Sequence, residues 1–128
     1  MKKLSLVICA ILIAVCTILT GCSKKNPPLI FLYYNGGISA SEYSEIEIKE
    51  GETVDVLINY AAPRKIKKID LRIGTGENEE ISKFDTPTSH TINREITFEK
   101  SGITHIKSSL VDQDENEYNL DIKFKVNK

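Results

Sequence analysis

Cysteine is scarce in this 128-residue sequence and is confined to its N-terminal part. The three cysteines are Cys9, Cys16 and Cys22, so residues 23–128 contain none. A segment without cysteine has no disulfide framework, no thiolate metal site and no cysteine nucleophile. The stability of this segment must therefore come from buried apolar surface and from backbone pairing.

The sequence also has no excess of basic over acidic residues. The chain has 17 Lys and Arg residues against 18 Asp and Glu residues, which gives a formal net charge of −1. Proteins that bind nucleic acid usually carry a clearly basic face. The composition therefore argues against a nucleic acid partner, and the length is that of a single domain.

Signals of catalysis are sparse as well. His90 and His105 are the only histidines. We expect His90 in a loop rich in Thr and Ser, and His105 on the solvent side of a strand, opposite Ile106. No serine lies in a Gly-x-Ser-x-Gly turn. The sequence thus favours a protein that is not an enzyme and that holds no cofactor and no metal ion.

The N-terminus has the three parts of an export signal. Lys2 and Lys3 form a short cationic start, and Leu4–Leu19 is apolar apart from Ser5 and Thr17. This run is shorter than the roughly 20 residues of a spanning helix, but it suits the apolar core of a signal peptide. Leu19-Thr20-Gly21-Cys22 ends the run.

Together these parts resemble the leader and lipobox of bacterial lipoproteins. The resemblance implies a helical signal peptide over residues 1–21 that is cleaved before Cys22, and a diacylglycerol thioether on Cys22. Two alternatives are an uncleaved signal anchor with a free Cys22 and an ordinary cleaved secretory peptide. The lipoprotein interpretation predicts an extracytoplasmic protein anchored to a bacterial membrane.

Residues 22–28 form the predicted lipidated cysteine and a short tether. The six residues from Ser23 to Pro28 reach at most about 20 Å when extended, and Pro27-Pro28 favours a stiff geometry. Lys24 and Lys25 either meet anionic headgroups or are solvated. Ser23, in place of aspartate, resembles the pattern of outer-membrane lipoproteins in bacteria with two membranes.

Residues 29–128 show the period of two that is typical of half-buried strands. The clearest case is the last run, in which apolar and polar residues alternate from Tyr118 to Asn127. Turn signals separate the runs, for example Asn35-Gly36-Gly37 and Ser101-Gly102. Such alternation is typical of antiparallel sheets with one face buried. We predict an all-β, antiparallel sandwich of about seven strands.

Two segments carry a resemblance to a known fold family. SGITHIKSSLVDQDENEYNLDIKFKV, residues 101–126, resembles the closing hairpin of bacterial immunoglobulin-like and PKD-like domains. EIEIKEGETVDVLI, residues 45–58, is similar to their early strands and the turn between them. The resemblance implies an immunoglobulin-like β-sandwich over residues 29–128.

Two clusters of charge are candidate binding sites. The acidic segment Asp112–Glu117 is either a solvated hairpin turn or a weak calcium site, since calcium prefers oxygen ligands. The basic segment Arg64–Lys68 either touches lipid headgroups or acidic polysaccharide, or it solubilises a loop and protects an edge strand.

The apolar segment Leu29–Tyr34 offers a third candidate, because both its odd and its even positions are apolar. Tyr33, Tyr34 and Tyr43 would bind sugar rings if their side chains were exposed. The first function that we expect is therefore a lipid-anchored protein-interaction or assembly module, whose sheet edge docks an envelope protein. The alternative is a glycan-binding accessory domain that uses these tyrosines.

Overall fold

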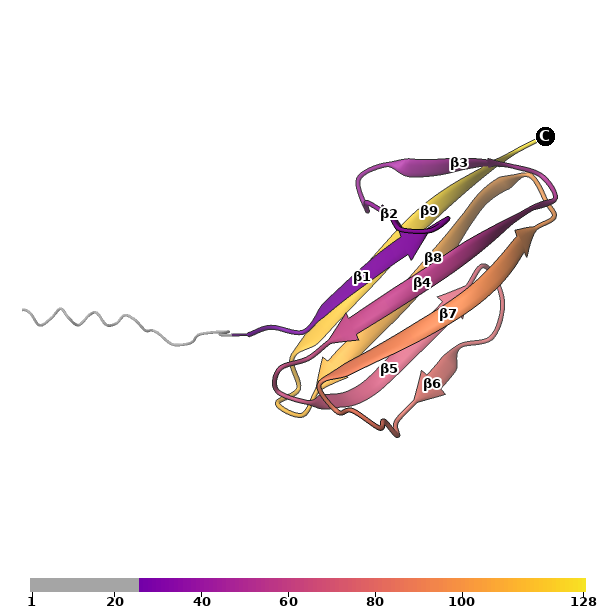
Figure 1. Cartoon of the computed structure of the whole chain (residues 1–128). Helices are drawn as coiled ribbons and strands as arrows, with labels where there is room; N and C mark the ends of the chain where they lie inside the picture. Colours follow the sequence, from indigo (N-terminus) through magenta and orange to yellow (C-terminus); the bar gives the residue numbers. More distant parts are fainter. Residues whose placement is uncertain (1–25) are drawn as a thin grey trace, which may run out of the picture.

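The computed structural model describes residues 26–128. The predicted helical signal peptide (residues 1–21) and the lipidated Cys22 lie outside the described residues, as does the tether as far as Lys25. Among the described residues, no helix is long and apolar enough to cross a membrane. The described part is built from strands that form one body (Figure 1).

Nine strands follow one another along the chain, and seven of them have five or more residues. They are β1 (Leu29–Tyr34), β2 (Ile38–Ser39), β3 (Glu45–Lys49), β4 (Glu52–Ala61), β5 (Ile66–Ile73), β6 (Glu79–Ile81), β7 (Ser89–Phe98), β8 (Gly102–Asp112) and β9 (Glu117–Asn127). The seven longer strands agree with the predicted number. The two short strands, β2 and β6, are additions that two or three residues of alternation do not predict.

The strands form two packed sheets, as expected for a sandwich. One sheet has the order β2-β1-β4-β7, and the other has the order β3-β9-β8-β5-β6. The chain changes sheet five times, between β2 and β3, β3 and β4, β4 and β5, β6 and β7, and β7 and β8. The pairing of β1, β4 and β7 in one sheet and of β5, β8 and β9 in the other is that of an immunoglobulin-like sandwich. The predicted all-β sandwich is therefore confirmed. One pair departs from the antiparallel pattern, because β3 runs parallel to β9.

The alternating residues of the long strands meet between the sheets. In β9, Leu120, Ile122, Phe124 and Val126 are all buried, while the residues between them face outward. Phe124 stacks on Phe98 of the other sheet, with ring centroids 4.9 Å apart. Each Å² of apolar surface that such contacts remove from water stabilises the fold by about 25 cal/mol. This burial stabilises a domain that has no disulfide.

A buried hydrogen-bond chain also joins the two sheets. The Ser108 hydroxyl of β8 donates to the Asp70 carbonyl of β5 over 2.6 Å. Because its single proton is used there, the Tyr60 hydroxyl of β4 must donate to Ser108 Oγ, over 2.7 Å. In antibody-type domains the corresponding strands are joined by a disulfide. Here a tyrosine and a serine link them.

This link makes the stability depend on pH in alkaline solution. Burial raises the pKa of Tyr60 from 10.0 to about 12, and only 1% of the residue is exposed. Above pH 10 the unfolded chain releases this proton while the folded chain keeps it, so stability falls as the pH rises towards 12. We expect the free energy of unfolding of Tyr60→Phe to fall by about 2 to 3 kcal/mol less between pH 10 and 12 than that of the wild-type protein. Urea unfolding at a series of pH values measures it.

Tyr43→Phe is the matched control, because Tyr43 is 99% exposed. It should leave the fall between pH 10 and 12 unchanged. If the free energy of unfolding of Tyr60→Phe falls as steeply above pH 10 as that of the wild type, the claim that the buried Tyr60 hydroxyl keeps its proton is wrong.

The tether enters at one end of the sandwich, which we call the tether end. Leu29 pairs with Ala61, and Ala61 pairs with Ser89. Ile66 pairs with Asp112, so the β4–β5 loop and the β8–β9 turn extend from the same end. Figure 1 shows the chain entering there and the C-terminus at the opposite end.

Candidate functional site

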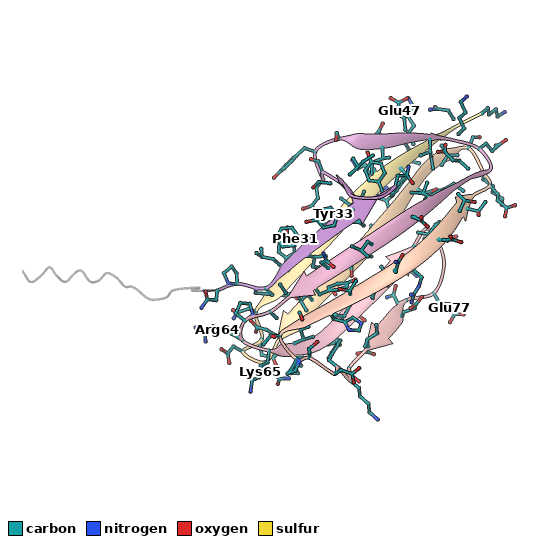
Figure 2. All side chains as sticks on the ribbon, in the orientation of Figure 1. Phe31, Tyr33, Glu47, Arg64, Lys65 and Glu77 are labelled. Carbon is teal, nitrogen blue, oxygen red and sulfur yellow. The ribbon has the colours of Figure 1, made fainter. Side chains whose placement is uncertain are left out.

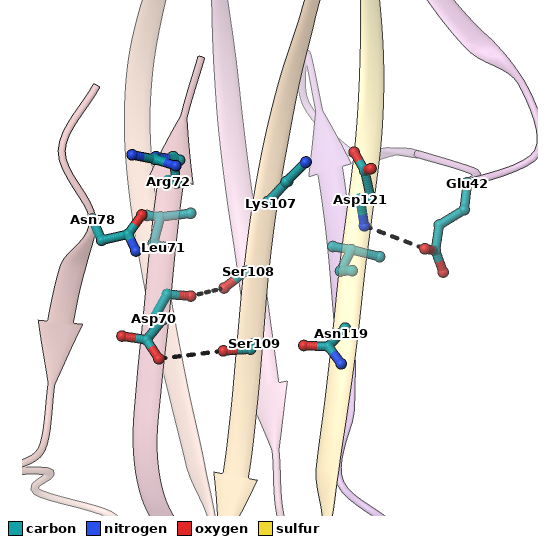
Figure 3. A pocket seen from close by; sticks show the side chains of 11 residues that line it. Glu42, Asp70, Leu71, Arg72, Asn78, Lys107, Ser108, Ser109, Asn119 and Asp121 are labelled. Atoms are coloured by element: carbon teal, nitrogen blue, oxygen red, sulfur yellow. Dashed lines mark hydrogen bonds between the residues drawn. The ribbon is translucent and has the colours of Figure 1, made fainter. Parts of the chain in front are cut away.

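The outer face of the five-stranded sheet carries a polar groove of about 500 Å³ (Figure 3). Small-ligand pockets have volumes of about 300 to 1,000 Å³. Three neighbouring strands build its floor in two rows. One row is Arg72, Lys107 and Asp121, and the other is Asp70, Ser109 and Asn119. Glu42 and Asn78 close the two sides from loops.

Hydrogen bonds hold several of the groove residues in place. The Asp121 carboxylate accepts a hydrogen bond from His105, with Nδ1 and Oδ1 2.8 Å apart, and the Asp121 backbone N–H donates to Glu42. The Arg72 Nε–H donates to the Gly76 carbonyl over 3.0 Å. The groove therefore offers positioned donors and acceptors to a polar ligand. Sequence reasoning missed it, because its residues come together only through the register of β5, β8 and β9.

The three candidate tyrosines do not form one surface. Tyr33 lies on the outer side of β1. Tyr34 points to the other side, because neighbouring residues of a strand alternate, and its ring meets Phe124 edge-on at 6.4 Å. Tyr43 stands almost fully exposed in the loop after β2. Tyr43 neighbours Glu42 of the groove in sequence, whereas Tyr34 is part of the core packing.

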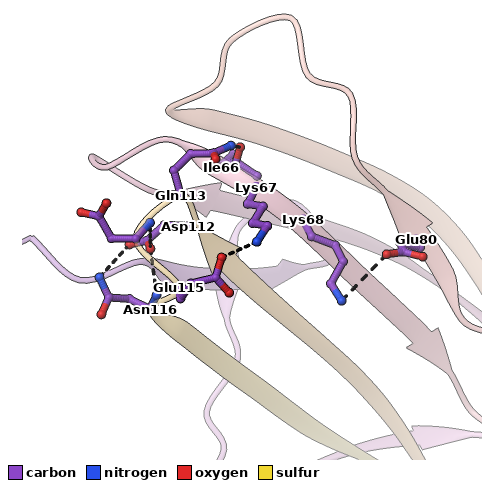
Figure 4. A network of polar contacts seen from close by, with 9 residues as sticks. Ile66, Lys67, Lys68, Glu80, Asp112, Gln113, Glu115 and Asn116 are labelled. Carbon is purple, nitrogen blue, oxygen red and sulfur yellow. Dashed lines mark hydrogen bonds and ion pairs between the residues drawn. The ribbon is translucent and has the colours of Figure 1, made fainter.

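The acidic turn is organised around a buried carboxylate (Figure 4). Asp112 is 0% exposed. Its Oδ1 accepts the backbone N–H groups of Asp114 and Asn116, and its Oδ2 accepts the Asn116 side-chain amide. The lone pairs of this carboxylate thus face the donors of its own turn. Within residues 26–128, no group of three or more His, Cys, Asp and Glu side chains is arranged to hold a metal ion.

The basic segment pairs with the acidic turn. Arg64 contacts Asp114 at 2.7 Å, and Lys67 contacts Glu115. Lys68 lies 3.8 Å from Glu80 of β6. These pairs neutralise most of the positive charge of the segment. β6 pairs only with Ile69–Leu71 of β5, so Lys67 and Lys68 lie where that side of β5 has no neighbouring strand among the described residues, as expected for residues that protect an edge.

The two histidines lie in different sheets. His90 belongs to β7, where its ring contacts Phe84 edge-on at 5.1 Å. The prediction that it lies in a loop is wrong, because β7 begins at Ser89. Alternation along the strand places the His90 side chain on the inner side of the sheet, opposite Tyr60. His105 lies on the outer side of β8, as expected, and is bound to Asp121.

The outer edge of β7 is not paired with another strand of the described part, although the Ser89 N–H and C=O bond to Thr86 and the Asn93 C=O accepts from the Arg94 guanidinium. Within the described residues, β4 is its only strand partner. The Asp55 carbonyl accepts the Asn35 N–H, so the odd residues of β4 direct their backbone groups toward β1 and the even residues toward β7. Even residues of β7 therefore bond to β4. The N–H groups of Thr91, Asn93, Glu95 and Thr97 point to the open edge.

No protein-family model and no curated protein matches this sequence. The arrangement of its own residues must therefore carry any statement about function.

Proposed function

We propose that the protein is an extracytoplasmic bacterial lipoprotein, anchored to a membrane through Cys22, that acts as a non-catalytic protein-interaction or assembly module. In bacteria with two membranes we place it at the outer membrane, on the basis of Ser23. The leader and the lipobox support the anchor. The open edge of β7 supports the interaction.

The edge of β7 is the observation on which the interaction rests. An unpaired strand edge is a template for a strand of another chain, because its N–H and C=O groups supply directional hydrogen bonds. Ten residues without proline form this edge. The Arg94 guanidinium bonds to Glu79 of β6 over 2.7 Å, which helps to fix the strand before a partner arrives.

Asn93→Pro tests this edge with little change elsewhere. Proline removes the backbone N–H, and at Asn93 this donor faces the open edge rather than β4. The experiment is a crosslinked pull-down from intact cells with the lipidated protein. We expect Asn93→Pro to lose the envelope protein that the wild-type sequence captures. Asn93→Ala keeps the N–H and should retain it. Equal capture by both variants would contradict strand addition.

The groove favours glycan binding as a second candidate function. Carboxylate, amide and hydroxyl groups of the kind found at Asp70, Asn119 and Ser109 bind sugar hydroxyls, and Tyr43 stands exposed beside Glu42. The same pull-down separates the two candidates. Capture of a polysaccharide that Asn93→Pro leaves unchanged, and that Tyr43→Ala reduces, would favour the groove.

A further inference from the structure

Half of the outer face of the four-stranded sheet carries no charged side chain. Three rows cross this sheet from the tether end. They are Leu29, Ala61 and Ser89, then Phe31, Asn59 and Thr91, then Tyr33, Leu57 and Asn93. We call these residues the uncharged patch. In a chain with 27% charged residues, three such rows are a marked segregation.

The apolar part of the uncharged patch is open to solvent. Leu29 is 38% exposed and Phe31 is 45% exposed. Phe31 and Tyr33 both project from β1 close to the entry of the chain (Figure 2). Two of the polar side chains satisfy each other, since the Thr91 hydroxyl donates to Asn59 Oδ1 over 3.0 Å. This pairing lowers the cost of removing both from water.

Charge returns immediately beyond the patch. In the next row Asp55 lies opposite Glu95. The outer face of the other sheet carries Arg72, Lys107 and Asp121, among other charged residues. The uncharged patch is therefore bounded by this acidic pair, beyond which Thr53 and Thr97 form one further uncharged row on the same face.

We propose that the uncharged patch rests on the lipid surface to which Cys22 is anchored. This inference rests on the proposed lipid anchor, because the anchor identifies what covers the patch. Six residues separate Cys22 from Leu29, and they reach at most about 20 Å. The first row of the patch is thus held close to the headgroups, where leucine, phenylalanine and tyrosine side chains insert favourably.

The surrounding charges agree with this orientation. Arg64 and Lys65 lie at the tether end (Figure 2), beside the acidic turn whose Asp114 pairs with Arg64, so the charges of these two segments largely offset each other there. The acidic pair Asp55 and Glu95 is repelled by an anionic surface, so the far half of the sheet tilts away. The groove on the opposite sheet then faces away from the membrane. Because the patch itself is uncharged, its contact should persist at high salt.

A fluorescent label at two matched positions tests the contact. Thr91→Cys and Thr97→Cys place a label on the same outer side of β7, and each removes one threonine hydrogen bond to β4. The full-length lipidated protein is bound to vesicles of phosphatidylethanolamine and phosphatidylglycerol. We expect quenching by aqueous iodide to be several-fold weaker at residue 91 than at residue 97.

A second pair of variants assigns this protection to the patch. Phe31→Glu in the Thr91→Cys protein should raise quenching to the level of residue 97, while the protein still sediments with the vesicles. Ile103→Glu should leave the protection intact, since Ile103 is similarly exposed, at 48%, and lies on the other sheet.

Three results would overturn the proposal. Equal quenching at both positions on sedimented vesicles removes the contact and leaves the anchor standing. A protein that stays in the supernatant with an unmodified Cys22 removes the anchor and the contact together. Protection of residue 91 in an unlipidated Cys22→Ser protein, without vesicles, would show that a second copy of the chain covers the patch.

Discussion

Cys22→Ser is expected to abolish the fatty-acid label on the protein and, once the leader is removed, to shift the protein from the membrane fraction to the soluble extracytoplasmic fraction. Each buried methylene of an acyl chain contributes about 0.8 kcal/mol, so two or three chains hold the protein firmly. Serine supplies no thiol for the thioether. The measurement is metabolic labelling with a fatty acid, followed by fractionation.

Cys16→Ser provides the matched control for this substitution. Cys16 lies within the apolar run of the leader, where a small polar residue is tolerated, as Thr17 already shows. We expect it to keep both the label and the membrane attachment. If Cys22→Ser also keeps the label, another residue carries the acyl chain and the lipobox interpretation is wrong.

The second large effect is expected at Asp112. Asp112→Ala should lower the free energy of unfolding by about 3 kcal/mol, because three partly buried hydrogen bonds that hold the turn lose their charged acceptor. The donors are the N–H groups of Asp114 and Asn116 and the Asn116 amide. For a domain whose total stability is about 5 to 15 kcal/mol, this is a large fraction. Urea unfolding at neutral pH measures the loss.

Asp114→Ala separates this role from simple loss of negative charge. Asp114 lies in the same turn, but its side chain is half exposed and pairs with Arg64 at the surface. Exposed pairs contribute about 0 to 1 kcal/mol, so the expected loss is small. Equal losses in the two variants would show that Asp112 does not organise the turn.

Much of the fold follows from local pattern. Alternation from Tyr118 to Asn127 predicts β9 and its buried face, because successive side chains of a strand point to opposite sides of the sheet. The parallel pairing of β3 with β9 does not follow, since the alternation of Ile46 and Ile48 fits either direction. Strand partners depend on long-range contacts that no local pattern contains.

The candidate site was less predictable. Asp112 shares its parity with Ile106 and Leu110, a signal of burial that its acidic neighbours conceal. The ion pairs between Arg64 and Asp114 and between Lys67 and Glu115 join segments about 50 residues apart. The rows of the groove and of the uncharged patch likewise exist only once the register of neighbouring strands is known.

The anchor at Cys22 determines how every other surface is presented, because it sets which end of the sandwich meets the membrane. Its most direct test is the intact mass of the protein extracted from its native membrane. We expect a chain that begins at Cys22 and carries the added mass of a diacylglyceryl group, with or without a further acyl chain. A chain with a free thiol at Cys22, or with its leader still attached, would contradict the anchor.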